Sequence, residues 1–281
     1  MALPDFLIIG AMKCATSTLA AQLAAQPSVF LTVPKEPEFF SDDAIHARGR
    51  AWYETLFAEA PPGACKGEAS TGYTKLPTHP HAVARIRDLV PEVRLIYIIR
   101  NPLDRLVSHY IHEWTTGVID GDLRSALSHH PELVDYGCYG RQIAPYVDAF
   151  GTDRILLLTL DAMTRDPQAM LARVHGFIGA TGTPRWQSER ERMNASEERF
   201  RRLPFHKLLV NNPAARRLRH ALVPKAVRER IRRGRQITDR PGLDAADLAR
   251  LRPVFAEDRD RLRALFPGRA DIEGCYPFLT A

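Results

Sequence analysis

Long apolar runs are missing from this sequence of 281 residues. No stretch of about 18 or more consecutive apolar residues occurs, so the sequence predicts no transmembrane helix. The N-terminus leads directly into Asp5-Phe6-Leu7-Ile8-Ile9. It lacks the basic stretch and the small-residue cleavage site that mark a signal peptide. We therefore expect a cytoplasmic protein.

Cysteine is also scarce, and its spacing excludes the common metal sites. The four cysteines are Cys14, Cys65, Cys138 and Cys275. They lie far apart and form no CxxC pattern, which favours free thiols in a reducing compartment. The histidine groups His79-Pro80-His81 and His129-His130 have no carboxylate or thiol at helical spacing. We therefore expect no metal site.

Negative charge is scarce in one segment of the chain. From Arg199 to Arg240 there are fourteen Lys and Arg residues against two acidic ones. This segment, the basic segment below, carries a formal charge of +12, and the remainder carries −6, which together give the net +6. Such asymmetry indicates an anionic partner for one region rather than for the whole surface.

Short strand-like runs alternate with helical patterns in the first two thirds of the chain. The expected strands are Phe6–Ile9, Val29–Thr32, Leu95–Ile99 and Ile155–Leu160. The expected helices are Ser17–Ala25, Pro80–Leu89, Pro102–Trp114 and Gln168–Ile178. Continuous runs rich in Ile and Leu are typical of strands buried on both faces of a parallel sheet. This alternation predicts an α/β fold with a doubly wound parallel sheet.

After about Thr181 the strand patterns end. Basic helices are expected within Leu208–Ile231, and a long amphipathic helix over Asp244–Leu265. We interpret the chain as one domain, 1–281, with an α/β core at 1–180 and a helical C-terminal part at 181–281. The composition, 45% hydrophobic, is ample for one core of this size.

The first strand leads into a loop of small residues, Gly10 to Thr18, before a helix begins. A strand, a small-residue loop and a helix N-terminus together form an anion site, because backbone N–H groups converge there. Lys13 adds a full positive charge, and Thr16, Ser17 and Thr18 add hydroxyls and helix-capping groups. Cys14 is interpreted as a small residue of this loop, not as a nucleophile.

The position of the lysine separates this loop from the nucleoside-triphosphate P-loop, GxxxxGK[ST]. Lys13 follows Gly10 by three residues, and no adjacent Lys-Ser pair is available to hold magnesium. A P-loop-like element that binds a phosphate group without an obligatory metal is therefore expected.

A second phosphate-binding element follows the strand Leu95–Ile99. Arg100 stands at the carboxyl end of this strand, where its planar guanidinium could bind a phosphate. Ser108 lies eight residues farther on, about two helical turns, and could donate to the same group. Two such elements on one sheet suit a nucleotide with two separate phosphate groups.

With these two elements the sequence resembles the PAPS-dependent sulfotransferases, whose donor is 3′-phosphoadenosine-5′-phosphosulfate (PAPS). The first loop of that family has the form GxxKxGTT, matched by Gly10, Lys13, Ala15, Thr16 and Ser17. The second has the form IxRxPxxRxxSxY, matched by Ile98, Arg100, Pro102, Arg105, Ser108 and Tyr110. Ala15 replaces the usual second glycine of the first loop.

The resemblance implies that residues Lys13, Cys14, Ala15, Thr16, Ser17 and Thr18 bind the 5′-phosphosulfate. It implies that Lys13 contacts the bridging oxygen, and that Arg100 and Ser108 bind the 3′-phosphate. PAPS is thus the expected co-substrate, with no metal.

A carboxylate beside this site could take the proton of an acceptor hydroxyl. Glu36 and Glu38 follow the second expected strand and precede Phe39-Phe40. The segment resembles the acidic-then-Phe-Phe motif of the heparan-sulfate branch of the family, and this match places the catalytic base at Glu36. Residues Gly67 to Tyr73 resemble the GEKTPxY motif of the same branch. There Ala69 replaces the lysine, which weakens the case for a heparan-like acceptor.

We therefore expect a sulfotransferase that acts on a hydroxyl or amine of a carbohydrate, a lipid or a small metabolite. The alternatives are a nucleotide kinase or NTPase, which would need magnesium, and a non-enzymatic polyanion-binding protein that uses the basic segment. We expect that segment, 199–240, to recruit an anionic acceptor or an anionic membrane surface. No nucleic-acid partner is expected.

Overall fold

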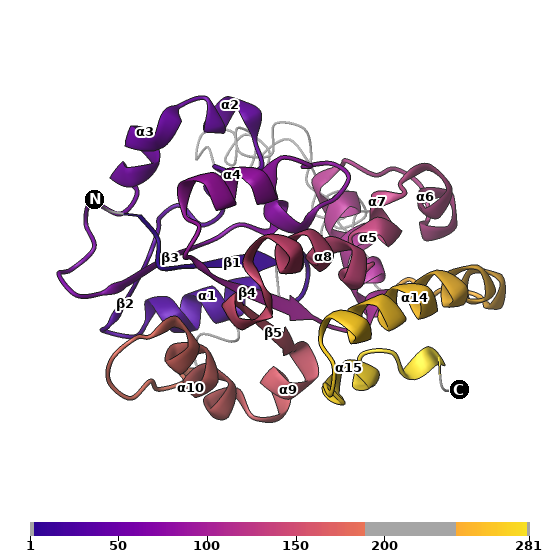
Figure 1. Cartoon of the computed structure of the whole chain (residues 1–281). Helices are drawn as coiled ribbons and strands as arrows, with labels where there is room; N and C mark the ends of the chain where they lie inside the picture. Colours follow the sequence, from indigo (N-terminus) through magenta and orange to yellow (C-terminus); the bar gives the residue numbers. More distant parts are fainter. Residues whose placement is uncertain (1–2, 189–239, 280–281) are drawn as a thin grey trace, which may run out of the picture.

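The structure, a computed structural model, describes residues 3–188 and 240–279. At its centre lies a five-stranded sheet in the order β2-β3-β1-β4-β5, with every described pairing parallel (Figure 1). The strands are β1 (Phe6–Gly10), β2 (Val29–Leu31), β3 (Cys65–Ala69), β4 (Arg94–Ile99) and β5 (Ile155–Thr159). The predicted doubly wound α/β fold is confirmed.

Strand β3 was not predicted from the sequence, although it lies between β2 and β1. Its sequence, Cys-Lys-Gly-Glu-Ala, contains residue types that are depleted in strands. Gly67 is required there by packing, because a Cβ at this position would come within 2.3 Å of the Phe6 ring. Pairing with strands on both sides therefore overrides a weak local preference.

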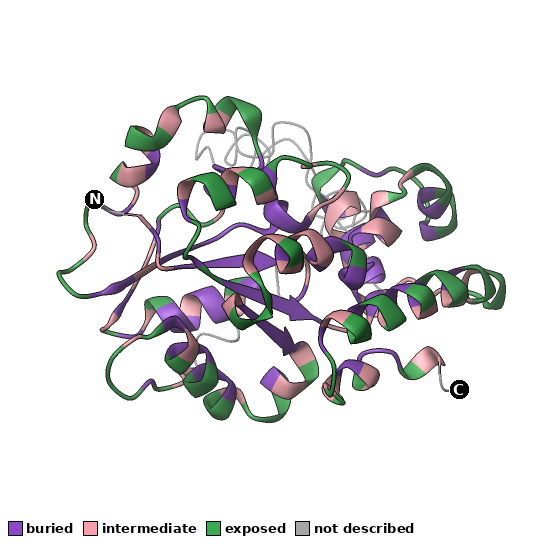
Figure 2. Cartoon of the chain, in the orientation of Figure 1, coloured by how far each residue is buried: buried purple, intermediate pink, exposed green. Residues whose placement is uncertain are grey.

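Helices cover both faces of the sheet. In the first two thirds of the chain they are α1 (Thr16–Ala24), α2 (Asp43–His46), α3 (Gly49–Thr55), η1 (Thr71–Thr74), α4 (Ala82–Leu89), α5 (Pro102–Thr116), α6 (Leu123–His129), α7 (Glu132–Asp135), α8 (Tyr139–Phe150), η2 (Thr152–Arg154), α9 (Leu160–Arg165) and α10 (Pro167–Ile178). Helices α1, α9 and α10 lie on one face, and α4 and α8 on the other (Figure 1). Strands β1, β3, β4 and β5 and the inward sides of these helices are mostly buried, and β2 is partly buried (Figure 2).

The predicted C-terminal helix is present as α14 (Ala245–Leu265), followed by α15 (Asp271–Gly274) and η5 (Pro277–Leu279). Asp244 begins α14 with a capping box that includes Asp247. Helix α14 packs on α8, and its buried Asp258 accepts hydrogen bonds from the backbone N–H groups of Gly140 and Arg141, both at 2.8 Å. The basic helices expected within 208–231 lie outside the described residues. Among the helices of the described ranges, none is long and apolar enough to cross a membrane.

Candidate active site

The carboxyl ends of four strands bring three predicted site residues, together with Thr71, to one edge of the sheet. Lys13 follows β1, Glu36 follows β2, Thr71 follows β3 and Arg100 follows β4. Because the strands are parallel, these segments lie at the same edge. Strands β2 and β3 lie on one side of β1 in the sheet, and β4 and β5 lie on the other. The order in which the chain adds strands therefore reverses at β1. Ligands of open α/β sheets bind outside the carboxyl ends of the strands at such a point.

The loop from Gly10 to Thr18, the phosphate loop below, ends in an uncapped helix N-terminus. Helix α1 begins at Thr16, and its N-cap residue Ala15 makes no capping hydrogen bond through its side chain. The expectation that Thr16, Ser17 or Thr18 caps this helix was therefore wrong. Thr16 is buried, Ser17 is exposed and Thr18 is partly buried. The first-turn N–H groups, which a capping side chain would otherwise cover, are suited to an anion.

Backbone conformation shapes the same loop. Lys13 and Ala15 both lie in the left-handed region, with φ of 67° and 61°. A Cβ at Gly10 would come within 2.0 Å of the Thr74 hydroxyl, which itself donates to the Ile9 carbonyl at 2.7 Å. The close approach of η1 thus explains the glycine and fixes the start of the loop.

Cys14 points into the protein. It is fully buried, and its Sγ lies 3.6 Å from the Tyr139 hydroxyl. Burial raises the pKa of this thiol to about 11, against smaller opposing effects from Tyr139 and two arginines. The thiol therefore stays protonated near neutral pH, which agrees with its interpretation as a small packing residue rather than a nucleophile.

Arg100 connects β4 to the phosphate loop. Its Nη1 donates to the carbonyl oxygen of Lys13 at 3.2 Å, and the residue is partly exposed. The next residue, Asn101, caps α5 by accepting from the Leu103 N–H at 3.0 Å. Ser108 lies about two turns farther along α5 and is partly exposed. The structure thus brings Arg100 together with the phosphate loop, whereas the link between Arg100 and Ser108 still depends on their spacing.

Glu36 is held against the segment that follows β3. Its N–H donates to the Ala69 carbonyl at 3.0 Å, and its carboxylate accepts from the Thr71 hydroxyl at 3.3 Å. On its other side the carboxylate pairs with Lys35 at 2.5 Å, and the side chain remains 34% exposed. Thr71 is a residue that sequence reasoning missed, although it lies within the segment that resembles the GEKTPxY motif, at the position of the proline.

Glu38 is held differently from Glu36. Its N–H donates to the Ser70 hydroxyl at 3.2 Å, and its carboxylate accepts a short hydrogen bond from the Ser41 hydroxyl. A Cβ at Gly72 would come within 2.0 Å of this carboxylate, so the glycine makes room for it. The Glu38 carboxylate is therefore held by a neighbouring hydroxyl, whereas that of Glu36 is held by Lys35 and Thr71.

Glu68, another residue not singled out from the sequence, lies fully buried in β3. Neither of its carboxylate oxygens has a hydrogen-bond partner of normal geometry in the described part of the chain. Burial raises its pKa to about 7, an effect that the nearby hydroxyls of Tyr73 and Tyr53 partly oppose. A buried carboxyl group therefore lies one residue before Ala69, whose carbonyl accepts the hydrogen bond from the Glu36 N–H.

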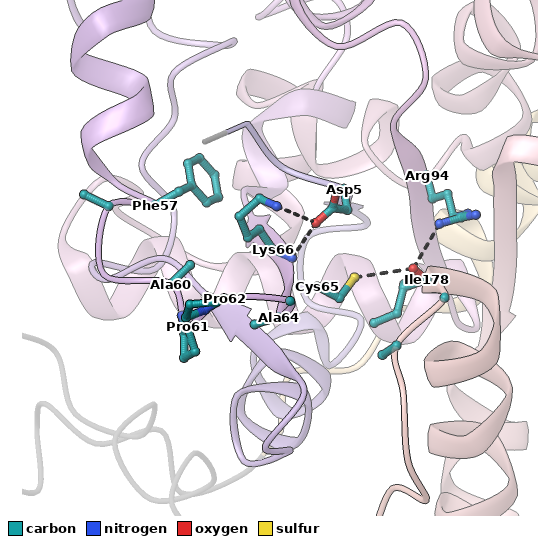
Figure 3. A pocket seen from close by; sticks show the side chains of 14 residues that line it. Asp5, Phe57, Ala60, Pro61, Pro62, Ala64, Cys65, Lys66, Arg94 and Ile178 are labelled. Carbon is teal, nitrogen blue, oxygen red and sulfur yellow. Dashed lines mark hydrogen bonds and ion pairs between the residues drawn. The ribbon is translucent and has the colours of Figure 1, made fainter. Parts of the chain in front are cut away.

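The opposite edge of the sheet contains a hollow with a different character (Figure 3). Asp5 pairs with Lys66 at 3.1 Å, and also accepts from the Lys66 N–H at 2.7 Å. Arg94 donates to the carbonyl oxygen of Ile178 at 3.0 Å. The charged side chains that line this hollow are thus bonded to the protein itself.

In residues 3–188 and 240–279 no cluster of three or more His, Cys, Asp or Glu is suited to a metal ion.

Comparison with known structures shows the same fold in characterised proteins. A sulfotransferase from Alicyclobacillus acidocaldarius superposes with a TM-score of 0.67 and 22% identity, covering 94% of this chain and 96% of that one. Mouse sulfotransferase SULT7A1, whose structure is a complex with PAP, superposes with a TM-score of 0.50 and 15% identity, covering 97% of this chain and 86% of that one.

Similar sequences also occur among curated proteins. Human heparan sulfate glucosamine 3-O-sulfotransferase 6 is 27% identical over 184 residues, which cover 63% of this chain and 52% of that protein. Mouse bifunctional heparan sulfate N-deacetylase/N-sulfotransferase 4 is 26% identical over 204 residues, covering 64% of this chain and 22% of that protein. The chain thus spans about half the length of the first relative. The family model for the sulfotransferase domain matches residues 3–260, and the chain therefore belongs to the sulfotransferase family.

Proposed function

We propose that this protein transfers a sulfuryl group from PAPS to a hydroxyl or amine of an acceptor. The observation that carries the proposal is the contact between two phosphate-binding elements. Arg100 Nη1 donates to Lys13 O, so the arginine and the uncapped N-terminus of α1 border one site. A nucleotide with phosphates at both the 3′ and 5′ positions needs two such elements. The PAP complex of the mouse sulfotransferase supports the choice of nucleotide.

The proposed chemistry is an in-line transfer at sulfur. The acceptor oxygen or nitrogen forms a bond to sulfur while the bond from sulfur to the 5′-phosphate oxygen breaks. Glu36 takes the acceptor proton, and Lys13 neutralises the charge that develops on the leaving phosphate oxygen. Arg100, with Ser108, anchors the 3′-phosphate. The protein contributes mainly positioning and charge stabilisation.

The names of the curated relatives favour a carbohydrate acceptor, while Ala69 leaves this chain without the lysine of the GEKTPxY motif. A lipid or a small metabolite therefore remains an alternative acceptor. We further propose that the protein is cytoplasmic and that the basic segment recruits an anionic acceptor or membrane. That segment, 199–240, lies outside the described residues except for Arg240, which pairs with Asp104 at 3.0 Å.

The role of the basic segment can be tested by one combined variant. In this variant Arg228, Arg230, Arg232 and Arg233 are all changed to Gln. The apparent KM for the acceptor should rise and lose its dependence on salt, because screened attraction is removed. Nucleotide affinity should stay the same. Unchanged acceptor kinetics, together with unchanged binding to anionic vesicles, would show that these arginines are simply solvated.

A thermal-shift experiment tests the nucleotide assignment. Adenosine 3′,5′-bisphosphate should stabilise the protein without magnesium and far more than 5′-AMP does. The 3′-phosphate makes charge-assisted hydrogen bonds worth about 1.5–3 kcal/mol each, so the two nucleotides should differ in affinity by more than about tenfold. A larger shift with ATP and magnesium would favour a kinase or NTPase. A shift with heparin alone would favour a non-enzymatic polyanion-binding protein.

A further inference from the structure

Arg105 is the second arginine of the motif that begins at Arg100, and the structure places it out of reach of solvent. It lies in α5 with 0% of its side chain exposed. Burial lowers its pKa, yet a guanidinium remains charged in proteins. Removing such a charge from water is unfavourable unless an opposite charge or a full set of hydrogen bonds compensates it. The contacts of Arg105 show how far this is achieved.

The compensation of Arg105 within the described residues is incomplete. Its Nη2 donates a short hydrogen bond to the Leu133 carbonyl, and its Nε has no hydrogen-bond partner in the part of the chain that the structure describes. Its Nη1 lies 3.3 Å from Nδ1 of His109. Burial lowers the pKa of His109 to about 4, so the imidazole is neutral near pH 7. Its Nδ1 can then accept the hydrogen of Arg105, while Nε2 carries a hydrogen and faces Glu113 at 3.4 Å.

This chain of contacts separates charge along α5. The negative end is Glu113, whose side chain is 20% exposed and lies one imidazole ring away from the guanidinium. The nearby carboxylates are bonded elsewhere: Asp258 of α14 to the N-terminus of α8, Asp135 to Arg141, and Glu132 to His130. The positive end, Arg105, therefore has no directly bonded carboxylate among residues 3–188 and 240–279.

The positive end lies behind the phosphate loop. Arg105 Nε packs against Gly137, where an added Cβ would come within 3.2 Å of it, and Tyr139, two residues farther on, contacts Cys14 Sγ of the loop at 3.6 Å. In agreement with this placement, the charge of Arg105, like that of Arg100, opposes the rise in the Cys14 pKa that burial causes. Cys14 immediately follows Lys13 and is fully buried. Through the buried protein between them, a charge is screened much less than through water. Arg105 thus projects a positive field into the loop from the inner side.

We propose that Arg105 is a buried counter-charge for the bound nucleotide, acting from beneath the phosphate loop without touching the ligand. The inference rests on the proposed function, in which the ligand is an anionic nucleotide. That nucleotide would supply the negative charge that is missing beside Arg105, at the positive end of the chain formed by Arg105, His109 and Glu113. Arg105 is accordingly a residue that sets affinity by charge, and its contribution grows with the negative charge of the ligand.

Calorimetric titration of Arg105→Met tests this inference with adenosine 3′,5′-bisphosphate and 5′-AMP. Methionine fills similar space without charge. The bisphosphate should bind on the order of 10- to 100-fold more weakly, and 5′-AMP only several-fold more weakly, as Coulomb's law requires for ligands of unequal charge. Arg105→Lys should recover part of the affinity. The matched control is Arg269→Met, which removes an arginine bound to Asp271 and to the Leu157 carbonyl, and it should leave both affinities unchanged.

Glu113→Gln provides a second test with the opposite sign, and it keeps the inference testable if Arg105→Met does not fold. This change removes the negative end of the chain while leaving Arg105 in place, so the bisphosphate should bind several-fold more tightly. A purely structural role for the chain predicts unchanged or weaker binding. Equal losses for both nucleotides in Arg105→Met, or no gain in Glu113→Gln, would overturn the inference. A wild-type protein that does not bind the bisphosphate would instead overturn the proposed function, and the inference with it.

Discussion

The two ends of strand β4 each carry an arginine, and the two arginines differ in what they bind. Arg94 begins the strand and donates to the carbonyl of Ile178, the last residue of α10. Arg100 follows the strand and donates to the carbonyl of Lys13, beside the N-terminus of α1. A cation at a helix C-terminus is stabilising, whereas a helix N-terminus favours an anion. Folding therefore accounts for Arg94, whereas the position of Arg100 fits the anionic ligand that we propose for this site.

The same contrast extends over the two edges of the sheet. At the amino edge, Asp5 and Lys66 satisfy each other. The described non-glycine residues with positive φ all belong to the carboxyl edge: Lys13, Ala15, Glu36 and Glu38. Such a conformation costs about 1–2 kcal/mol per residue. The carboxyl edge thus concentrates features that folding alone disfavours, which is typical of functional sites.

The largest expected difference between the two edges concerns turnover. Glu36→Gln should reduce turnover roughly 10²- to 10⁴-fold, the usual contribution of a general base, and leave nucleotide affinity nearly unchanged. Asp5→Asn, the control at the amino edge, should leave turnover of the folded protein unchanged. Steady-state kinetics and nucleotide titration measure both. If Glu36→Gln keeps full turnover while Glu38→Gln loses it, Glu38 is the base.

The pH dependence of stability tests the buried carboxyl group of the carboxyl edge. The pKa of Glu68 is raised from 4.5 to about 7 in the folded state. The folded protein therefore holds this proton more tightly, and the resulting stability is present below about pH 4.5 and lost as the pH rises through about 7. Relative to wild type, Glu68→Gln should gain up to about 3 kcal/mol in unfolding free energy between pH 5 and pH 8. Urea unfolding at both pH values measures this, and parallel pH profiles would contradict it.

The two arginines of β4 provide a matched pair of substitutions. Arg100→Ala should weaken binding of adenosine 3′,5′-bisphosphate by about 1.5–3 kcal/mol, because a charge-assisted partner of the phosphate is lost. Arg94→Ala should leave nucleotide affinity unchanged and lower the unfolding free energy by about 1 kcal/mol. Equal nucleotide affinities in the two variants would remove the distinction between the ends of the strand.

The smallest expected effect concerns the left-handed positions near the two edges. Ala15 has φ of 61°, and Ala15→Gly should raise the unfolding free energy by up to about 1 kcal/mol. Relief of backbone strain in the folded protein should exceed the stabilisation of the unfolded chain by the greater conformational entropy of glycine. Gly179 has φ of 75° beside Arg94, and Gly179→Ala should lower it by about 1 kcal/mol. Thermal unfolding of both variants tests this pair. A destabilised Ala15→Gly would show that the alanine methyl group packs favourably.

The elements that the sequence predicted well carry strong local patterns. Strand β4 is a continuous apolar run that ends in Arg100, and α5 begins with Asn101-Pro102, so both were recognisable together with the phosphate loop. Strand β3 lacked such a pattern, because Lys66, Gly67 and Glu68 have low strand propensity. These residues form a strand through pairing and packing with their neighbours in the sheet. Its absence from the prediction also concealed Thr71, which follows it and contacts Glu36.

The amino-acid sequence by itself determined the α/β class, the phosphate loop with Lys13, and the candidacy of Arg100 and Glu36. These follow from residue types at fixed spacings along short segments. Only the tertiary structure decided that Glu38 is engaged with Ser41, that Cys14 faces inward, and that Arg105 is buried. Burial and charge pairing depend on segments far apart in the chain, such as α5 with Leu133 or β3 with the Glu36 segment. Contacts between such distant segments set the local dielectric around each charged group and the hydrogen-bond partners available to it. No short stretch of sequence encodes either property.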